Sequence, residues 1–191
     1  MQVSIKTSPM NWMTPLLLTN PPLILDADLL SSFAWVDRLD ILEKLFPQQM
    51  IVLDEVMDEL RRVVHLSTRV QNCIDKGLIK NVSMTADSPE ALELGQILNT
   101  GRYGNGEAAC MAYLKNNDGT MYSNNLSDVH TFCGANGKDL ITTAMIMHHA
   151  VEKAVIDDAE AEIIWAKMIA KRRKLPASSY SAYLASLGQN Q

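Results

Sequence analysis

The chain has few aromatic residues, few cysteines and no long uninterrupted hydrophobic run. Aromatics make up 6% of its 191 residues, too few for a platform on which single-stranded nucleic acid could stack. The three cysteines, Cys73, Cys110 and Cys133, form no C-x-x-C pair and no zinc-finger pattern, so we expect reduced thiols. The formal net charge of −5 excludes a polycation that coats nucleic acid, although local contacts stay open.

No segment has the pattern of a membrane span or an export signal. Residues 7–25 carry no charge, but four prolines and two asparagines interrupt them, whereas a spanning helix needs about 20 mainly apolar residues. The run Leu16–Leu18 is too short for the apolar core of a signal peptide. We therefore expect a cytoplasmic protein that makes no membrane contact.

Short apolar runs alternate along the chain with segments of helical periodicity. The apolar runs are 23–25, 50–53, 120–123 and 139–142, and the helical segments are 29–45, 54–64, 88–101, 107–115, 143–154 and 157–173. This alternation predicts βαβ units, and hence an α/β fold with a central, mostly parallel sheet between two layers of helices.

The same pattern divides the chain into three parts. We expect a proline-rich segment at 1–22, an α/β domain at 23–154 and a C-terminal helical extension at 155–191.

Acidic residues fall where parallel sheets usually place functional groups, just beyond the carboxyl ends of the strands. Asp26 directly follows the apolar run 23–25, where a buried carboxylate is costly unless it serves a purpose. The structural alternative is an N-cap for the next helix, and Asp28 fits that role better. Asp26 is therefore the first candidate for a functional acid.

Three further acids are candidates for the same site. Glu59 lies beside the apolar stripe of its helix, where a solvated position is the alternative. Glu107 follows Gly-Asn-Gly and heads a stripe that faces the core, a placement that the helix dipole alone does not explain. Asp128 lies about one helical turn beyond Asn125, which follows the third apolar run. A cap or surface position is the alternative for Asp128.

A convergence of these acids would require a cation, because buried like charges repel. Oxygen ligands without histidine or cysteine favour hard ions such as Mg²⁺ or Mn²⁺. Such ions bind phosphate oxygens and activate water. The acids therefore indicate hydrolysis of a phosphate ester.

Four segments, in this order, resemble a PIN domain: LILDADLLSSFAWVDRLDILEKLF, IVLDEVMDEL, GNGEAACMAYLK and MYSNNLSDVHTFC. The resemblance covers about residues 22–150. It implies a PIN-like three-layer nuclease fold, and many prokaryotic members of this family are ribonuclease toxins of toxin–antitoxin pairs. We therefore expect RNA as substrate, an antitoxin as a partner and a homodimer.

The resemblance also implies roles for the acids. Asp26, Glu59 and Glu107 match three acids of the family's active site, and the position of the fourth falls on neutral Asn125. Asp128 would supply the missing charge from the next turn. Asp26, Glu107 and Asp128 would then hold one or two Mg²⁺ or Mn²⁺ ions, with Glu59 as a ligand or acting through water.

We expect substrate contacts from polar residues around these acids, namely Asn125, Arg61, Arg62 and Thr142. The basic run Lys171–Lys174 is first interpreted as a set of cations that complement the carboxyl end of a helix. The alternative for this run is a contact with a phosphate backbone or an acidic partner.

Two other functions compete with a metal-dependent ribonuclease. Because Asn125 replaces an acid, the chain could be a degenerate PIN module that binds RNA or a protein without catalysis. A strand followed by Asp26-Ala27-Asp28 also opens phosphatases of the haloacid dehalogenase type. That family expects a small residue soon afterwards, where this chain has Leu29 and Leu30.

Overall fold

The computed structural model describes residues 20–188. Residues 1–19 of the expected proline-rich segment lie outside this range. Among residues 20–188, no helix is long and apolar enough to cross a membrane.

In the described part of the chain, five parallel strands form one sheet in the order β3-β2-β1-β4-β5. The strands are β1 (Leu23–Leu25), β2 (Met50–Leu53), β3 (Ile79–Val82), β4 (Thr120–Tyr122) and β5 (Leu140–Ile141). All three residues of β1 are buried, because this strand lies at the centre with helices on both faces. The expected α/β fold with a parallel sheet is confirmed.

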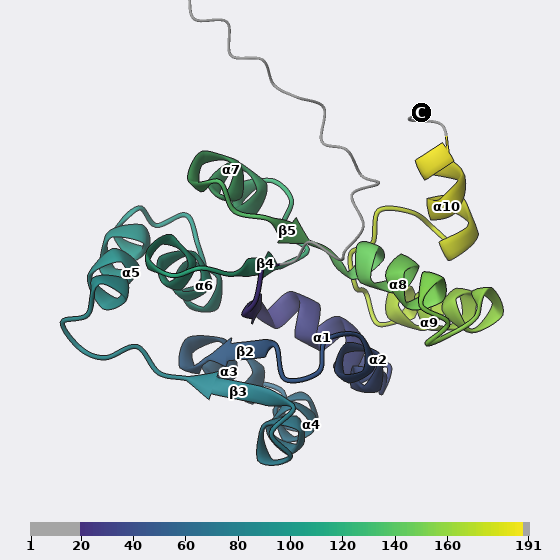
Figure 1. Cartoon of the computed structure of the whole chain (residues 1–191), viewed down its shortest axis with the longest axis horizontal. Helices are drawn as coiled ribbons and strands as arrows, with labels where there is room; N and C mark the ends of the chain where they lie inside the picture. Colours follow the sequence, from purple (N-terminus) through teal and green to yellow (C-terminus); the bar gives the residue numbers. More distant parts are fainter. Residues whose placement is uncertain (1–19, 189–191) are drawn as a thin grey trace, which may run out of the picture.

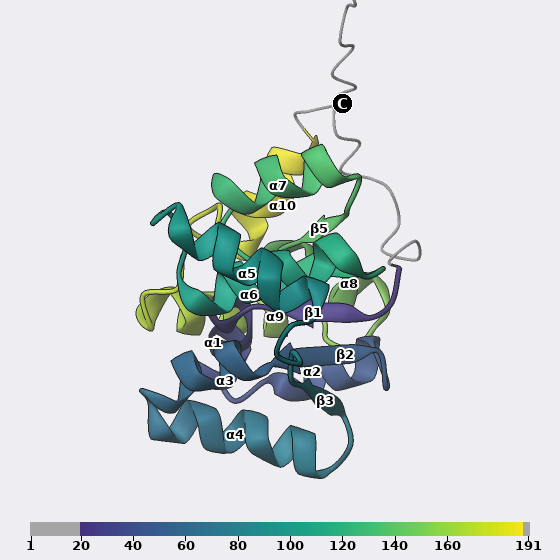
Figure 2. The same cartoon turned by 90° about the vertical axis from the view of Figure 1, so that its left-hand side faces the viewer.

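Helices cover both faces of the sheet. Figure 1 shows α5, α6 and α7 on one side and α1, α2, α8 and α9 on the other. Figure 2 shows β1, β2 and β3 one below another, with α5 and α6 in front. The helices are α1 (Ala27–Trp35), α2 (Leu39–Leu45), α3 (Asp54–Arg61), α4 (Val64–Asp75), α5 (Pro89–Asn99), α6 (Asn105–Asn116), α7 (Asp128–Asn136), α8 (Thr143–Glu152), α9 (Asp158–Ala170) and α10 (Tyr180–Gly188).

Several details differ from the sequence-based expectation. The expected helix 54–64 ends at Arg61, and the helix α4 was not expected. The expected helix 29–45 is two helices, α1 and α2, because Asp37 takes the left-handed conformation with a φ of 61°. The strand β3 was not expected, since it is an edge strand whose central residues Lys80 and Asn81 are exposed. An edge strand needs no continuous apolar run, so hydrophobicity alone does not reveal it.

The C-terminal helices pack on the same hydrophobic core as the sheet. Trp165 of α9 is fully buried, and its indole nitrogen donates a 3.0 Å hydrogen bond to the carbonyl of Ala177. The rings of Tyr180 and Tyr183 from α10 pack against Trp165. These contacts fix the path of residues 171–179, which link the two helices.

The order of the strands places a crevice beyond the carboxyl ends of β1 and β4. The chain leaves β1 towards β2 and β3, and the connection from β3 then crosses to β4 on the other side of β1. Neighbouring parallel strands whose connections lead in opposite directions form a common site for ligands. Asp26 lies at this point, and its backbone N–H donates a 2.9 Å hydrogen bond to the carbonyl of Tyr122.

The fold predicts a strong effect at Gly119, just before β4. A Cβ atom there would lie 2.5 Å from Ile24 Cδ1 and 2.7 Å from the carbonyl of Pro22, and the φ of +146° favours glycine. Gly119→Ala should therefore lower the free energy of unfolding by about 2 kcal/mol or more. Urea unfolding measures this change.

Gly95 in α5 provides the matched control. A Cβ atom at Gly95 meets nothing within 4 Å, so Gly95→Ala should raise the free energy of unfolding by about 0.5–1 kcal/mol. Equal effects at the two positions would contradict the close approach of β1 to the start of β4.

Candidate active site

A polar pocket of about 740 Å³ opens at the crevice beyond β1 and β4. The carboxylates among its lining residues come from α1, α3, α6, α7 and the end of β1, and they are Asp26, Asp28, Glu59, Glu107 and Asp128. All four acids that we predicted from the sequence thus line one pocket, and Asn125 lines it as well.

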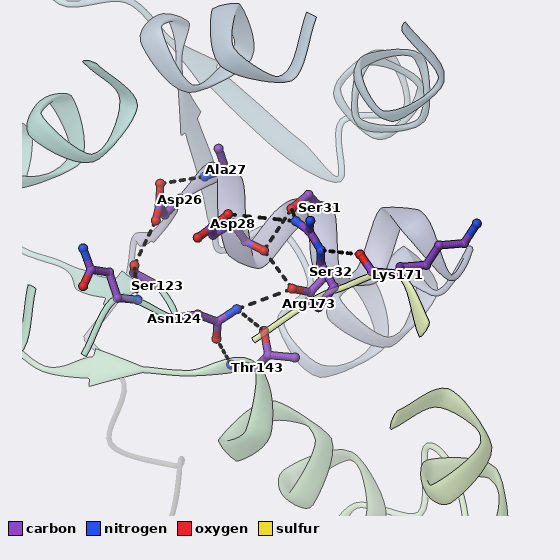
Figure 3. Close-up of polar contacts among 11 residues, drawn as sticks. Asp26, Ala27, Asp28, Ser31, Ser32, Ser123, Asn124, Thr143, Lys171 and Arg173 are labelled. Atoms are coloured by element: carbon purple, nitrogen blue, oxygen red, sulfur yellow. Dashed lines mark hydrogen bonds and ion pairs between the residues drawn. The ribbon is translucent and has the colours of Figure 1, made fainter. Parts of the chain in front are cut away.

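Asp26 is the most buried of these acids, with 5% of its surface exposed. One carboxylate oxygen accepts a 2.7 Å hydrogen bond from the N–H of Ala27 and caps α1. The other accepts a 2.8 Å hydrogen bond from the hydroxyl of Ser123 at the end of β4 (Figure 3). The expectation that Asp28 would cap this helix is wrong, because α1 begins at Ala27, two residues earlier than expected, and Asp28 lies exposed in its first turn.

Burial dominates the protonation of Asp26 and raises its pKa from 3.8 to about 7. The negative charges of Asp28 and Glu107 raise the pKa further, while the hydrogen bonds from Ser123 and Ala27 lower it. The hydrogen bonds from Ser123 and Ala27 therefore do not offset the loss of solvent around this carboxylate.

Glu59 lies against the first turn of α6. Its carboxylate accepts a 2.8 Å hydrogen bond from the N–H of Gly106, where the helix dipole also favours a negative charge. A Cβ atom at Gly106 would lie 3.0 Å from the carboxyl carbon of Glu59, and one at Gly104 would lie 3.3 Å from its oxygen. The two glycines of Gly-Asn-Gly thus let the amino end of α6 approach Glu59.

Glu107 is half-buried in the next position of α6. Asn125 donates a 2.7 Å hydrogen bond from its amide to a carboxylate oxygen of Glu107. Burial raises the pKa of Glu107, and the charges of Asp128, Asp28 and Glu59 raise it further, whereas Asn125 lowers it. Asn125 therefore does not act as a fourth acid here; it provides a donor that stabilises the charge of Glu107.

Asp128 is the first residue of α7, as the predicted helical turn requires. Its carboxylate accepts a 3.0 Å hydrogen bond from the exposed guanidinium of Arg102. Asp128 therefore reaches the pocket, but with a surface cation as its partner.

Residues that follow β4 connect the pocket to α1 and α8 through hydrogen bonds. Most of these residues were not among the site residues predicted from the sequence. The side-chain oxygen of Asn124 accepts a 2.9 Å hydrogen bond from the N–H of Thr143, and its amide donates to the hydroxyls of Thr143 and Ser32 (Figure 3). Ser123 donates to Asp26 as described. Their polar side chains at a strand end were the only signal available in the sequence.

Three of the expected substrate contacts do not line this pocket. Thr142 caps α8 by accepting from the N–H of Met145. Arg61 pairs with Asp58 on the outer face of α3, and Arg62 is exposed. A role for Arg61, Arg62 and Thr142 in binding stays a prediction. Arg172, Arg173 and Lys174 of the basic run line the pocket instead.

Within residues 20–188, no three histidine, cysteine, aspartate or glutamate side chains stand together as a metal-binding group. The hydrogen bonds explain this separation, because each of the four acids points to its own donor: Ser123 for Asp26, Gly106 for Glu59, Asn125 for Glu107 and Arg102 for Asp128.

The raised pKa of Asp26 predicts how stability depends on pH without divalent ions. Between pH 3.8 and about 7 the folded protein holds a proton that the unfolded chain releases, so stability falls as the pH rises through this range. Asp26→Asn removes the buried charge. In EDTA at pH 8 the variant should be more stable than the wild type, by up to roughly 4 kcal/mol.

Urea unfolding at pH 4 and pH 8 tests this expectation, and the gain should shrink towards pH 4. Asp87→Asn is the control, because Asp87 is an exposed aspartate with a φ of 66°, a conformation that asparagine also tolerates. A gain that is absent at pH 8, or equal at both pH values, would contradict the buried charge.

The comparisons with known proteins agree with this geometry at the level of the family. A family model described as a PIN domain matches residues 22–189, from β1 through α10. No curated protein and no solved structure matches the chain. The match spans well over half of the sequence, and the acids of the pocket lie on the segments that carried the resemblance. The chain therefore belongs to the PIN-domain family.

Proposed function

We propose that this protein is a metal-dependent ribonuclease whose active site is the acidic pocket beyond β1 and β4. The observation that carries the proposal is the buried carboxylate of Asp26. Its pKa is raised to about 7 by burial and by neighbouring acids, and it lies where the strand connections diverge in a chain of a nuclease family. Such a carboxylate costs stability, and a bound cation would offset that cost.

The donor set suits a hard divalent cation. Asp26, Glu107 and Asp128 would hold Mg²⁺ or Mn²⁺ through carboxylate oxygens, with Glu59 binding directly or through water. When bound, the ion polarises a phosphate oxygen and lowers the pKa of a water molecule.

The surrounding residues orient these ligands. Ser123 fixes one oxygen of Asp26, Gly106 holds Glu59, and Asn125 directs Glu107. These second contacts set the direction of each carboxylate. To bind the ion, Asp128 would have to give up its hydrogen bond with Arg102. The antitoxin, the homodimer and the cytoplasmic location rest on the resemblance and the composition, and stay predictions.

One observation favours a second candidate, an RNA-binding module without catalysis. Asn125 stands where the family has an acid, and each of the four acids already has a donor from the protein. In this alternative the pocket needs no ion, because Glu107 is hydrogen-bonded by Asn125 and Asp128 is paired with Arg102.

Cleavage of a pool of labelled RNAs with Mn²⁺ or Mg²⁺ distinguishes the two candidates. We expect cleavage by the wild type, a loss of at least about a hundredfold in Asp26→Asn and Glu107→Gln, and a smaller loss in Asp128→Asn. Asp87→Asn should leave the rate unchanged. Full activity of Asp26→Asn would contradict the assignment of the site.

Thermal unfolding with added Mn²⁺ gives a readout that is independent of turnover. At pH 7.5 the ion should raise the melting temperature of the wild type but not of Asp26→Asn. Arg102→Gln should strengthen the Mn²⁺ effect, because it frees Asp128. Absence of both cleavage and a Mn²⁺ effect in the folded wild type would favour the binding module.

A further inference from the structure

A basic segment from the C-terminal part of the chain forms one wall of the acidic pocket. Arg172, Arg173 and Lys174 directly follow α9, and they line the same pocket as Asp26 and Glu107. The acids come from the carboxyl ends of the strands and the helices that follow them, whereas this segment lies after β5 and α9 in the sequence. The pocket therefore has an acidic wall and a basic wall from different parts of the chain.

Arg173 fixes this segment to α1. Its guanidinium donates a 2.9 Å hydrogen bond to the hydroxyl of Ser31, and its Nε donates a 3.2 Å hydrogen bond to the carbonyl of Lys171. The same guanidinium lies 4.0 Å from a carboxylate oxygen of Asp28. Figure 3 shows Arg173 extending across to α1, the helix that Asp26 caps. The basic wall is thus held at a fixed place beside Asp26.

Arg172 occupies a position that usually favours glycine. Its N–H donates to the carbonyl of Ile169, and the N–H of Arg173 donates to that of Met168. This is the Schellman arrangement that ends a helix, and its left-handed residue is commonly glycine. Here that residue is Arg172, with a φ of 58°. An arginine at this position costs some backbone strain, as Ala154 does at the end of α8 with a φ of 53°.

Arg172 and Lys174 have charges that the described part of the chain does not neutralise. Both side chains are exposed, and neither makes a hydrogen bond or an ion pair with another residue of 20–188. By contrast, Arg173 bonds Ser31, and Lys171 lies 5.0 Å from the ring centre of Trp35. Two free cations therefore face a pocket in a protein whose formal net charge is −5.

The helix dipole does not account for this arrangement. Cations do stabilise the carboxyl end of a helix, but the effect fades within the last turn. It explains Lys171 at the cap of α9, and it does not explain the bond between Arg173 and Ser31 or the placement in the pocket. The first interpretation of the basic run is therefore incomplete.

We propose that Arg172 and Lys174 bind backbone phosphates of single-stranded RNA next to the phosphate at the acidic wall, with Arg173 as the residue that positions them. The identity of the ligand as RNA rests on the proposed function. Arginine suits this role because its planar guanidinium donates two parallel hydrogen bonds to a phosphate. In this arrangement the basic wall binds the part of the RNA next to the phosphate at the acidic wall. Its positive charge also offsets the repulsion between the acids and the polyanionic RNA.

The double variant Arg172→Gln/Lys174→Gln tests the proposal in the full-length protein. Binding of a labelled single-stranded RNA is measured by fluorescence anisotropy in EDTA, where binding is separated from metal-dependent cleavage. We expect an affinity loss on the order of tenfold at 0.1 M salt. The slope of log affinity against log salt should become shallower by about 1.4, since each phosphate contact contributes about 0.7 for single strands.

Lys76→Gln/Lys153→Gln is the charge-matched control. Both lysines are exposed and each directly follows the carboxyl end of a helix. Lys76 precedes β3, and Lys153 ends a helix that leads away from the pocket, so both belong to the opposite edge of the sheet. The control should leave the affinity and the salt slope unchanged.

Arg172→Gly separates a binding role from a structural one. Glycine suits the left-handed backbone, so the melting temperature should equal or exceed that of the wild type while RNA binding weakens. Unchanged RNA binding in the double variant, or an equal loss in the lysine control, would overturn the proposal. Equally tight, equally Arg172-dependent binding of a polyglutamate peptide of the same charge would also overturn it, in favour of an acidic protein partner.

The outcomes also separate this proposal from the proposed function. If the wild type cleaves no RNA but the double variant loses binding, the basic wall stands and the catalytic assignment fails. If the wild type cleaves RNA and the double variant binds as tightly as before, the ribonuclease stands and the basic wall fails.

Discussion

The arrangement of the site depends on the buried charge of Asp26. The central strand β1 is covered on both faces, so the residue that follows it cannot reach bulk water easily. Its carboxylate is stabilised by the N–H of Ala27 and the hydroxyl of Ser123, yet its pKa is still raised to about 7. Every nearby charge therefore matters, because each acid added to the pocket increases a cost that its donors do not fully offset.

The sequence predicts the features that depend on strong local signals. The continuous apolar run of β1, followed at once by Asp26, predicted both a central strand and a functional acid. The edge strand β3 was missed because its middle is polar. The partners of the acids were also missed, since the bond from Ser123 to Asp26 joins residues 97 positions apart. Spacing along one helix or strand gives no information about such pairs.

The substitution at Asn125 changes the electrostatics of the pocket. Its amide donates to Glu107 at 2.7 Å, where an aspartate would place two carboxylates in contact and would need a cation between them. Asn125 thus lowers the pKa of Glu107 without an ion. In the proposed site the same change would reduce the number of anionic ligands, so the protein would depend less on a cation for stability. Asp128 would then be the acid whose release from Arg102 sets the affinity for an ion.

The basic run could not be placed from the sequence, because its role depends on how α9 packs. Trp165 buries α9 against the core, and this packing directs residues 172–174 back to the acids. An acidic pocket alone repels a polyanion, and a basic pocket alone would neutralise the carboxylates that an ion requires. In the proposed function, opposite walls would serve both an ion and a polyanion, since negative charge lies at Asp26 and positive charge beside it. The left-handed turn at Arg172 and the bond from Arg173 to Ser31 hold the basic wall at a fixed place beside the acidic one.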